Sequence, residues 1–250
     1  MSAPIPGPPA WVPLGFILIT AAATALGGIA LTTRARWDDI LLEYFVALGA
    51  GFMLAAATLQ MIPVSASMTP FAPPLVLAGY LLIHLVEHTA VRHFHFGEET
   101  HTERTGGDVG LPALVGLSIH SFFDGVSIAS GFLVSPSLGL LLFVAIVLHK
   151  APEGFTIASI MLAAGRSRTA ALLSSVAVGA ASIVGALAVY PLRRFVAEGL
   201  ALSAGVTLYV AASDLIPEVN RSRARAIAAV VFAGVLLYYV TERILAAFGP

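Results

Sequence analysis

The chain has 250 residues, of which 58% are hydrophobic and 11% are charged, whereas about a quarter of an ordinary soluble domain is charged. This composition predicts an all-α, polytopic membrane protein and argues against a soluble domain. Thirteen Lys and Arg against 14 Asp and Glu leave no basic excess for nucleic acid, and the lack of cysteine excludes disulfides and Cys-ligated metal.

Eight apolar segments, each near the roughly 20 residues that cross a bilayer, follow one another along the chain. We predict membrane-spanning helices over 11–32, 41–62, 74–91, 111–133, 138–164, 170–190, 196–216 and 226–247. The first nine residues are rich in proline and contain no basic residue, so we expect a short exposed tail rather than a signal peptide. Residues 1–250 are then a single transmembrane domain.

Arginines are distributed unevenly between the loops. Nine follow the first, third, fifth and seventh predicted spans, whereas the loops on the opposite side contain only Arg193 and Arg194. Because cytoplasmic loops collect Lys and Arg, we expect a multi-pass protein of the cell (inner) membrane with both termini extracytoplasmic. Small residues in the sixth and seventh spans allow helices to pack closely in the lipid bilayer and leave a homodimer open.

An internal repeat links the second and seventh spans. Residues 51–63 (GFMLAAATLQMIP) align without gaps on residues 205–217 (GVTLYVAASDLIP). These spans would cross the membrane in opposite directions, so we predict an inverted repeat of spans one to three and six to eight around spans four and five. Such repeats are typical of transporters. Gly, Ala, Leu and Ile are common in membrane helices, so a chance match is the alternative.

Histidines gather at the end of the third span and in the loop after it. His84 and His88 are four residues apart and share a helical face, where they suit a metal exit path or interfacial anchoring. The cytoplasmic loop over 92–110 contains three more histidines, which are His93, His95 and His101. That loop is either a metal-binding segment or a solvated linker.

Paired ionisable residues lie inside the fourth and fifth spans. His120 and Asp124 have i, i+4 spacing, and His149 and Glu153 repeat it on the next span. Two imidazoles and two carboxylates on neighbouring antiparallel helices form a ligand set that suits Zn²⁺ or another divalent ion. The alternative is a buried polar network in which His120 bonds Asp124 and Lys150 pairs with Glu153.

A proline interrupts the pattern of the fifth span beside these residues. Pro152 lacks an N–H group, so it frees the Leu148 carbonyl and predicts a kink, at a point where we expect Gly154 also to loosen packing. Backbone oxygens could then line a cavity next to the ligands.

Two carboxylates close the seventh span. Asp214 and Glu218 have i, i+4 spacing near its cytoplasmic end, and Gln60 matches Asp214 in the repeat. They suit either a metal exit route or a pair of helix-end charges at the membrane interface, where carboxylates cost little.

The motifs HSFFDG at 120–125 and HKAPEG at 149–154 resemble the two signature helices of the ZIP (Zrt/Irt-like) family of divalent metal transporters, in its prokaryotic form. The eight spans and the LIPE sequence at 215–218 agree with this resemblance. It implies uptake of metal toward the cytoplasm through His120, Asp124, His149 and Glu153. It also implies an elevator-like movement of spans one, four, five and six against the other four.

The chain departs from the resemblance at a second metal position known in prokaryotic relatives. Ser121 and Lys150 stand where ligands are expected, and the sixth span has no acidic residue, with Ser182 as the nearest equivalent. A fixed ammonium would repel a second cation at close range. We therefore predict one transported ion per cycle.

Ligands without sulfur admit Zn²⁺, Fe²⁺, Mn²⁺, Co²⁺ or Cd²⁺ as the transported substrate. One competing function is an intramembrane metal-dependent hydrolase, but the chain has no HExxH motif and no obvious spare base. Another is a carrier of protons or small molecules whose histidines and carboxylates only shuttle protons. A GxxxxGK[ST] loop is absent, so ATP-driven pumping is unsupported.

Overall fold

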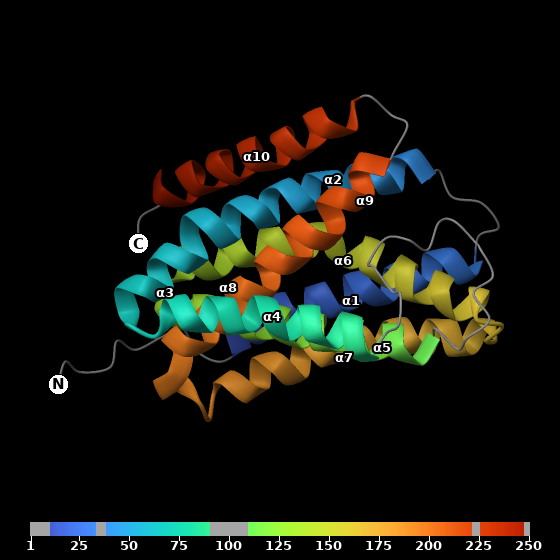
Figure 1. Ribbon diagram of the computed structural model, residues 1–250, viewed down its shortest axis with the longest axis horizontal. Helices are drawn as coiled ribbons and strands as arrows, with labels where there is room; N and C mark the ends of the chain where they lie inside the picture. Colours follow the sequence, from blue (N-terminus) through green and yellow to red (C-terminus); the bar gives the residue numbers. More distant parts are fainter. Residues whose placement is uncertain (1–10, 34–38, 91–109, 222–225, 248–250) are drawn as a thin grey trace.

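The computed structural model describes residues 11–33, 39–90, 110–221 and 226–247, and these residues form helices joined by short turns, without a strand. The helices are α1 (Trp11–Thr33), α2 (Asp39–Ala55), η1 (Ala56–Met61), α3 (Ile62–Met68), α4 (Ala72–Ala90), α5 (Gly110–Val134), α6 (Pro136–Ala163), α7 (Arg168–Val189), η3 (Arg193–Phe195), α8 (Val196–Tyr209), η4 (Val210–Leu215), α9 (Ile216–Arg221) and α10 (Ile227–Ala247). They lie roughly along one axis (Figure 1).

Within these residues, seven helical segments are long and apolar enough to cross a membrane, and α4 contributes a shorter apolar stretch, Ala72–Val86. Large apolar side chains point outward from the bundle, for example Phe232 at 76% exposed and Leu236 at 63% on α10. Such an outer surface fits lipid rather than water. The prediction of an all-α, polytopic membrane protein is confirmed.

The second and seventh spans are longer than we predicted because proline does not end them. Pro63 and Pro217 each follow a six-residue π-helical segment, and the helix continues beyond both prolines. A π turn bonds each N–H to the carbonyl five residues back, so it accommodates a residue that lacks an N–H and crowds the carbonyl four residues back. The sequence-based boundaries at 62 and 216 were therefore too early.

The two π segments occupy the same positions of the internal repeat. Segment 56–61 aligns on 210–215, and the N–H of the following isoleucine bonds the carbonyl of Ala57 in one copy and of Ala211 in the other. The two spans run in opposite directions (Figure 1). A common local conformation in antiparallel spans is the arrangement that an inverted repeat predicts.

Glycines join four helices into one tightly packed group. A Cβ atom on Gly154 of α6 would lie 1.8 Å from the Thr24 carbonyl oxygen of α1, and one on Gly27 would lie 2.0 Å from the Ala151 carbonyl oxygen. A Cβ on Gly125 of α5 would lie 1.8 Å from a carbonyl oxygen of α7. Because only glycine permits this approach, α1, α5, α6 and α7 are packed backbone against backbone.

The remaining spans form two pairs of the same kind. A Cβ on Gly51 of α2 would lie 2.0 Å from the Val231 carbonyl oxygen of α10, and one on Gly205 of α8 would lie 1.9 Å from the Val76 carbonyl oxygen of α4. Gly51 and Gly205 are equivalent in the repeat. The second span therefore packs on the eighth as the seventh packs on the third.

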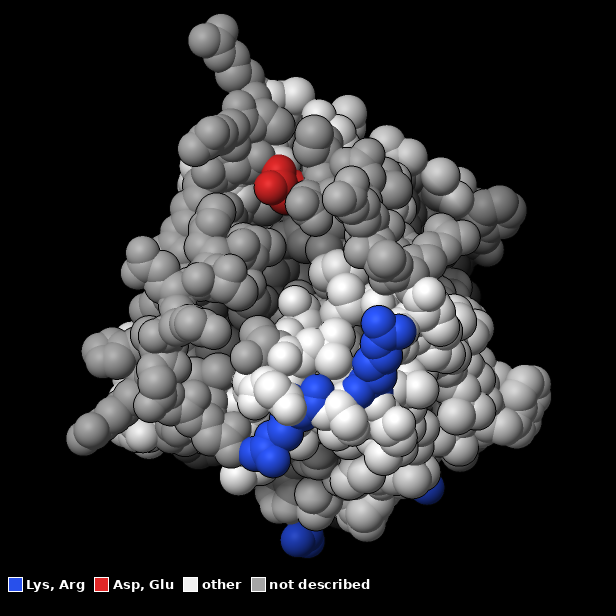
Figure 2. Space-filling view, turned by 90° about the vertical axis from the view of Figure 1, so that its right-hand side faces the viewer, with Lys and Arg blue, Asp and Glu red and all other residues white. Residues whose placement is uncertain are grey.

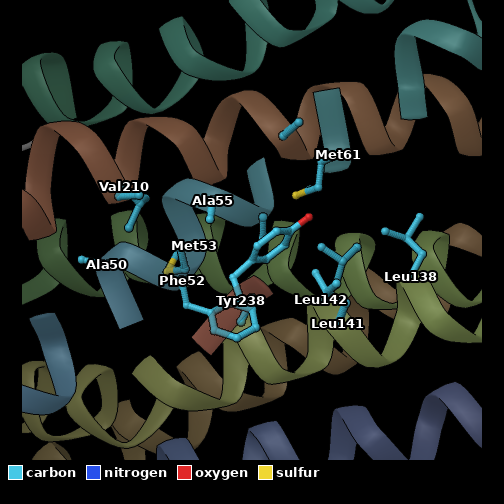
Figure 3. Packing of buried hydrophobic residues seen from close by; sticks show 14 of the residues in the cluster. Ala50, Phe52, Met53, Ala55, Met61, Leu138, Leu141, Leu142, Val210 and Tyr238 are labelled. Atoms are coloured by element: carbon cyan, nitrogen blue, oxygen red, sulfur yellow. The ribbon is translucent and has the colours of Figure 1, made fainter. Parts of the chain in front are cut away.

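A large apolar cluster fills the space between α2, α6, α8 and α10 (Figure 3). The rings of Phe52 and Tyr238 meet edge to face with centroids 5.7 Å apart, and Leu142 of α6 packs into the same cluster. Methionines 53 and 61 complete it from the second span. This cluster brings α6, which carries half of the paired motifs, against the second span.

Candidate metal site

A single residue, Ser135, separates α5 from α6, so the two helices turn back on each other directly. Its hydroxyl accepts a hydrogen bond from the Leu138 N–H at 3.1 Å, and Pro136 occupies the first turn, as is usual at a helix start. Close packing at Gly131 and Gly139 keeps the helices adjacent. This hairpin places both His-and-carboxylate motifs in one buried region.

His120, Asp124 and His149 form a compact group in that region. The Nε2 atom of His120 lies 3.3 Å from the Asp124 Oδ2 atom, and the Nε2 atom of His149 lies 3.6 Å from the same oxygen. One potential ligand atom from each residue lies within 4.8 Å of the other two, and all three residues are buried. Two imidazole nitrogens and a carboxylate oxygen at this separation can bind one divalent ion.

The hydrogen bond of His149 indicates which of its two ring nitrogens carries the proton and which one has a lone pair. Its Nδ1 atom lies 3.2 Å from the Ala145 carbonyl oxygen, which can only accept, so Nδ1 carries the proton in the neutral ring. Nε2 then presents a lone pair toward Asp124 Oδ2, which is also an acceptor. Two acceptors that face each other are stabilised by a proton or a metal ion between them. A metal-bound His typically donates its other N–H to a carbonyl or carboxylate, as Nδ1 of His149 does to the Ala145 carbonyl.

Lys150 is fully buried between both carboxylates. Its Nζ atom lies 2.7 Å from Asp124 Oδ2, donates to the Ser121 hydroxyl at 2.7 Å, and also donates to Glu153 Oε2. With neutral histidines, the group carries two negative charges and one positive charge. The net charge of −1 attracts a cation, while the ammonium already occupies the space between Ser121 and Glu153.

The structure brings three of the four predicted ligands into one compact group, which does not include Glu153, and Lys150 joins Glu153 to Asp124 of that group. Its Oε2 atom accepts from Lys150, whereas its Oε1 atom is buried and has no hydrogen-bond partner among the described residues. Lys150 and Glu153 thus form the ion pair of the alternative interpretation, and the contact of His120 with Asp124 fits both that interpretation and a metal site.

Three other predicted positions, Ser182, Pro152 and Gly154, differ in their local contacts. The Ser182 hydroxyl donates to the Gly179 carbonyl of its own helix at 2.7 Å, so it is engaged locally. Pro152 lies inside α6, which continues through it. At Gly154 our expectation of loosened packing was wrong, because this glycine makes the 1.8 Å approach to Thr24 and also accepts, through its carbonyl oxygen, a hydrogen bond from Ser175.

The predicted outlying residues lie on α4 and at the end of the seventh span. His84 and His88 share a face, with ring centroids 4.1 Å apart, and the His84 ring lies 6.0 Å from Tyr209 of α8. Asp214 is buried in η4, and Glu218 follows in α9. The histidines at 93, 95 and 101 lie outside the described residues, as does the side chain of Glu218.

Sequence reasoning missed three serines on the side of Asp124 toward the end of α5. Ser127, Ser130 and Ser203 are buried, and their hydroxyls make no hydrogen bond within the described part of the chain. Ser127 follows Asp124 by three residues, and Ser130 follows Ser127 by three, so the i, i+3 row on α5 was a signal present in the sequence. The contribution of Ser203 from α8 required the tertiary structure.

Comparison with known proteins gives a consistent result. The profile of the family described as ZIP Zinc transporter matches residues 98–242. The chain is 31% identical to Zinc transporter ZIP9-A of Xenopus laevis over 157 residues, which are 58% of this chain and 52% of that protein. It is 38% identical to Zinc transporter ZIP9 of Macaca fascicularis over 118 residues, 42% of this chain and 50% of that protein.

A more distant relative is Zinc transporter ZIP4 of Homo sapiens, which is 32% identical over 118 residues, 45% of this chain and 18% of that protein. The chain spans about half the length of the first of these relatives.

Proposed function

The chain belongs to the ZIP zinc transporter family, and from this premise we propose that it transports a divalent metal ion, with Zn²⁺ the first candidate, across a membrane. The family is one of transporters rather than enzymes. The ion would bind between His120, Asp124 and His149 at the centre of the bundle. Fe²⁺, Mn²⁺, Co²⁺ and Cd²⁺ are further candidates, since the same nitrogen and oxygen ligands accept them.

The observation that carries this proposal is the convergence of two imidazole nitrogens on one carboxylate oxygen. The two distances, 3.3 and 3.6 Å, leave the three ligand atoms close enough to approach a common ion with small side-chain rotations. Zinc binds His nitrogen and carboxylate oxygen at about 2.0–2.2 Å. Protons compete for the same ligands, so metal release is favoured where the pH is lower.

We propose that one ion moves per cycle because Lys150 substitutes for a second cation. Its ammonium contacts both carboxylates and Ser121, and it has no exposed surface. Zinc bound to Asp124 would lie within about 5 Å of this ammonium, given the 2.7 Å from Nζ to Oδ2 and a metal–oxygen bond of about 2.2 Å. A second divalent ion at Ser121 would have to displace the ammonium itself.

The packing supports movement of one helical group against the other. The glycine contacts under 3 Å lie within α1, α5, α6 and α7, or within the pairs α2–α10 and α4–α8. Across the boundary, a Cβ on Gly199 of α8 would meet Val126 of α5 at 3.6 Å, and one on Gly49 of α2 would meet His149 at 3.4 Å. These are ordinary contacts that can slide. We therefore propose alternating access by an elevator-like shift of the group that carries the site.

The orientation in the membrane that we propose follows from charge, and the direction of transport that we propose is the one that the ZIP resemblance implies. Arg166 and Arg168 are exposed at the turn between α6 and α7, on the end of the bundle that Figure 2 shows with its positive side chains. Loops with Arg face the cytoplasm, so this end would be cytoplasmic and both chain termini extracytoplasmic. We propose uptake toward the cytoplasm of a cell with this protein in its cell (inner) membrane.

A hydrolase would need a free general base beside the metal. Glu153 is the nearest carboxylate outside the three ligands, and its pairing with Lys150 leaves it poorly placed for that role. Nothing in the site favours hydrolysis over transport.

Uptake of Zn²⁺ into proteoliposomes that contain the purified protein tests the proposal. Wild type should accumulate Zn²⁺, Asp124→Asn should not, and Glu242→Gln should behave as wild type, because it removes a carboxylate from α10 away from the site. A wild type that moves none of the five metals, or an Asp124→Asn variant as active as wild type, would contradict it.

A further inference from the structure

Three buried hydroxyls between α5 and α8 have no hydrogen-bond partner among the described residues. Ser127 is 1% exposed, and Ser130 and Ser203 are fully buried. Buried serines and threonines of α1 and α7 instead donate to a carbonyl of their own helix three or four residues back: Thr20, Thr24, Ser174, Ser175 and Ser182. The hydroxyls of Ser127, Ser130 and Ser203 do not make this usual bond to a carbonyl of their own helix. Each buried hydroxyl left without a partner lowers the stability of the fold by about 1–3 kcal/mol.

The three serines form a line that leads to the metal ligands. Ser127 and Ser130 lie three and six residues beyond Asp124 on α5, which places them about 4.5 and 9 Å further along the helix axis. A Cβ on Gly199 of α8 would lie 3.7 Å from the Ser130 hydroxyl, so these positions face each other. Ser203 is four residues deeper on the antiparallel α8, and it is therefore level with Ser127.

The boundary on which this line lies has ordinary van der Waals contacts in place of close glycine contacts between backbones. Gly199 contacts α5 at 3.6–3.7 Å, whereas the glycines inside each helical group approach their neighbours at about half that distance. A small separation of α5 from α8 would expose three hydroxyl oxygens in succession. Hydroxyl oxygens can hydrogen-bond the water shell of a divalent cation and replace its waters one at a time.

An acidic residue lies beside the end of the line where α8 begins. Glu198 is in the first turn of α8, next to Gly199, and its Oε1 atom accepts a hydrogen bond from the Thr69 hydroxyl at 3.2 Å. Its Oε2 atom has no hydrogen-bond partner in the described structure. A carboxylate at this position raises the local concentration of cations.

We propose that the seam formed by Ser127, Ser130 and Ser203 is the hydrated path by which a divalent cation reaches Asp124 from the end of the bundle where α8 begins, with Glu198 as the first carboxylate it meets. This inference rests on the proposed function for the identity of the cargo. The water accessibility of the seam is a separate property and can be measured without transport.

The chain contains no cysteine, so single Ser→Cys variants can be labelled without altering any native residue elsewhere. Ser127→Cys, Ser130→Cys and Ser203→Cys would be reconstituted in vesicles and treated with a membrane-impermeant methanethiosulfonate reagent from each side in turn. Ser182→Cys is the matched control, because this serine is also fully buried but bonds within α7. Serine and cysteine are similar in size, and elution as a single species verifies folding.

The three seam variants should react at least tenfold faster than Ser182→Cys when the reagent is added at the end where α8 begins. Reaction at the rate of the control, or only from the opposite end, would overturn the inference. If the seam variants are labelled but wild type takes up no Zn²⁺, the inference of a hydrated seam is supported and the proposed function is contradicted. If wild type takes up Zn²⁺ but the seam variants are not labelled, the proposed function is supported and the inference of a hydrated seam is overturned.

Discussion

Packing at Gly27 offers a direct test of the division into two helical groups. A Cβ atom at this position would lie 2.0 Å from the Ala151 carbonyl oxygen and 2.8 Å from the Phe155 nitrogen, which are both backbone atoms. Carbon and oxygen in contact between helices are about 3.3–3.6 Å apart, so Gly27→Ala requires α1 and α6 to separate by about 1.3–1.6 Å. Backbone atoms cannot change rotamer to relieve such a contact.

Overpacking of this kind costs about 1–3 kcal/mol, and we expect the upper end, which corresponds to a fall in Tm of about 6–12 °C for a chain of this size. Gly15→Ala is the control in the same helix, because a Cβ there has no neighbour within 4 Å. It should leave Tm unchanged or raise it slightly, since alanine favours a helix by about 0.5–1 kcal/mol. Thermal unfolding in detergent, measured without added metal, reports both.

Gly199→Ala probes the boundary between the groups, where the nearest atoms are at 3.6 and 3.7 Å. It should be tolerated as well as Gly15→Ala. If Gly27→Ala has the same Tm as Gly15→Ala, the close packing of α1 on α6 is not rigid. If Gly199→Ala is as damaging as Gly27→Ala, the boundary does not separate two bodies, and the reasoning fails.

Three further predictions concern the metal site. Zinc at 100 times its Kd should stabilise wild type and Glu242→Gln by about 2.7 kcal/mol in thermal unfolding and leave Asp124→Asn unchanged; equal stabilisation of all three would remove Asp124 from the site. Lys150→Asp should raise the bound metal from one ion toward two per chain by elemental analysis, and a variant that still binds one would refute the role assigned to the ammonium. Ser121→Ala should lower the free energy of unfolding by about 1.5–3 kcal/mol, because it removes a hydrogen bond from the charged Lys150. The control Ser182→Ala loses only a bond within its own helix, so its free energy of unfolding should stay within about 0.5 kcal/mol of wild type. Similar losses in the two variants would contradict the hydrogen-bond network described around Lys150.

The helical architecture was largely predictable because bilayer-length apolar segments separated by charge leave few alternatives. The errors at 62 and 216 have one cause: a proline usually ends a helix, whereas the second and seventh spans continue through π turns before Pro63 and Pro217. The repeat was visible as a short alignment. Its shared π conformation could not be inferred from residues as common as Gly, Ala and Leu.

The site was predictable as a set of residues but not as a geometry. The i, i+4 pairs placed His120 and Asp124 on one face, whereas the contact of Lys150 with Asp124 depends on side-chain directions across two helices. Glu153 was expected as a fourth ligand, and its i, i+3 contact with Lys150 within α6 is the pairing that the alternative interpretation predicted. Gly154 was misinterpreted because the close approach of α1 to α6 has no local signal in the sequence.

The most direct test of the central claim is X-ray absorption at the zinc edge on the purified, zinc-loaded protein. Binding through His120, His149 and Asp124 predicts two imidazole ligands and oxygen ligands at about 2.0–2.2 Å, and predicts the loss of the imidazole signal in the variant His120→Ala, His149→Ala. A spectrum without imidazole, or one that the double variant leaves unchanged, would contradict the account.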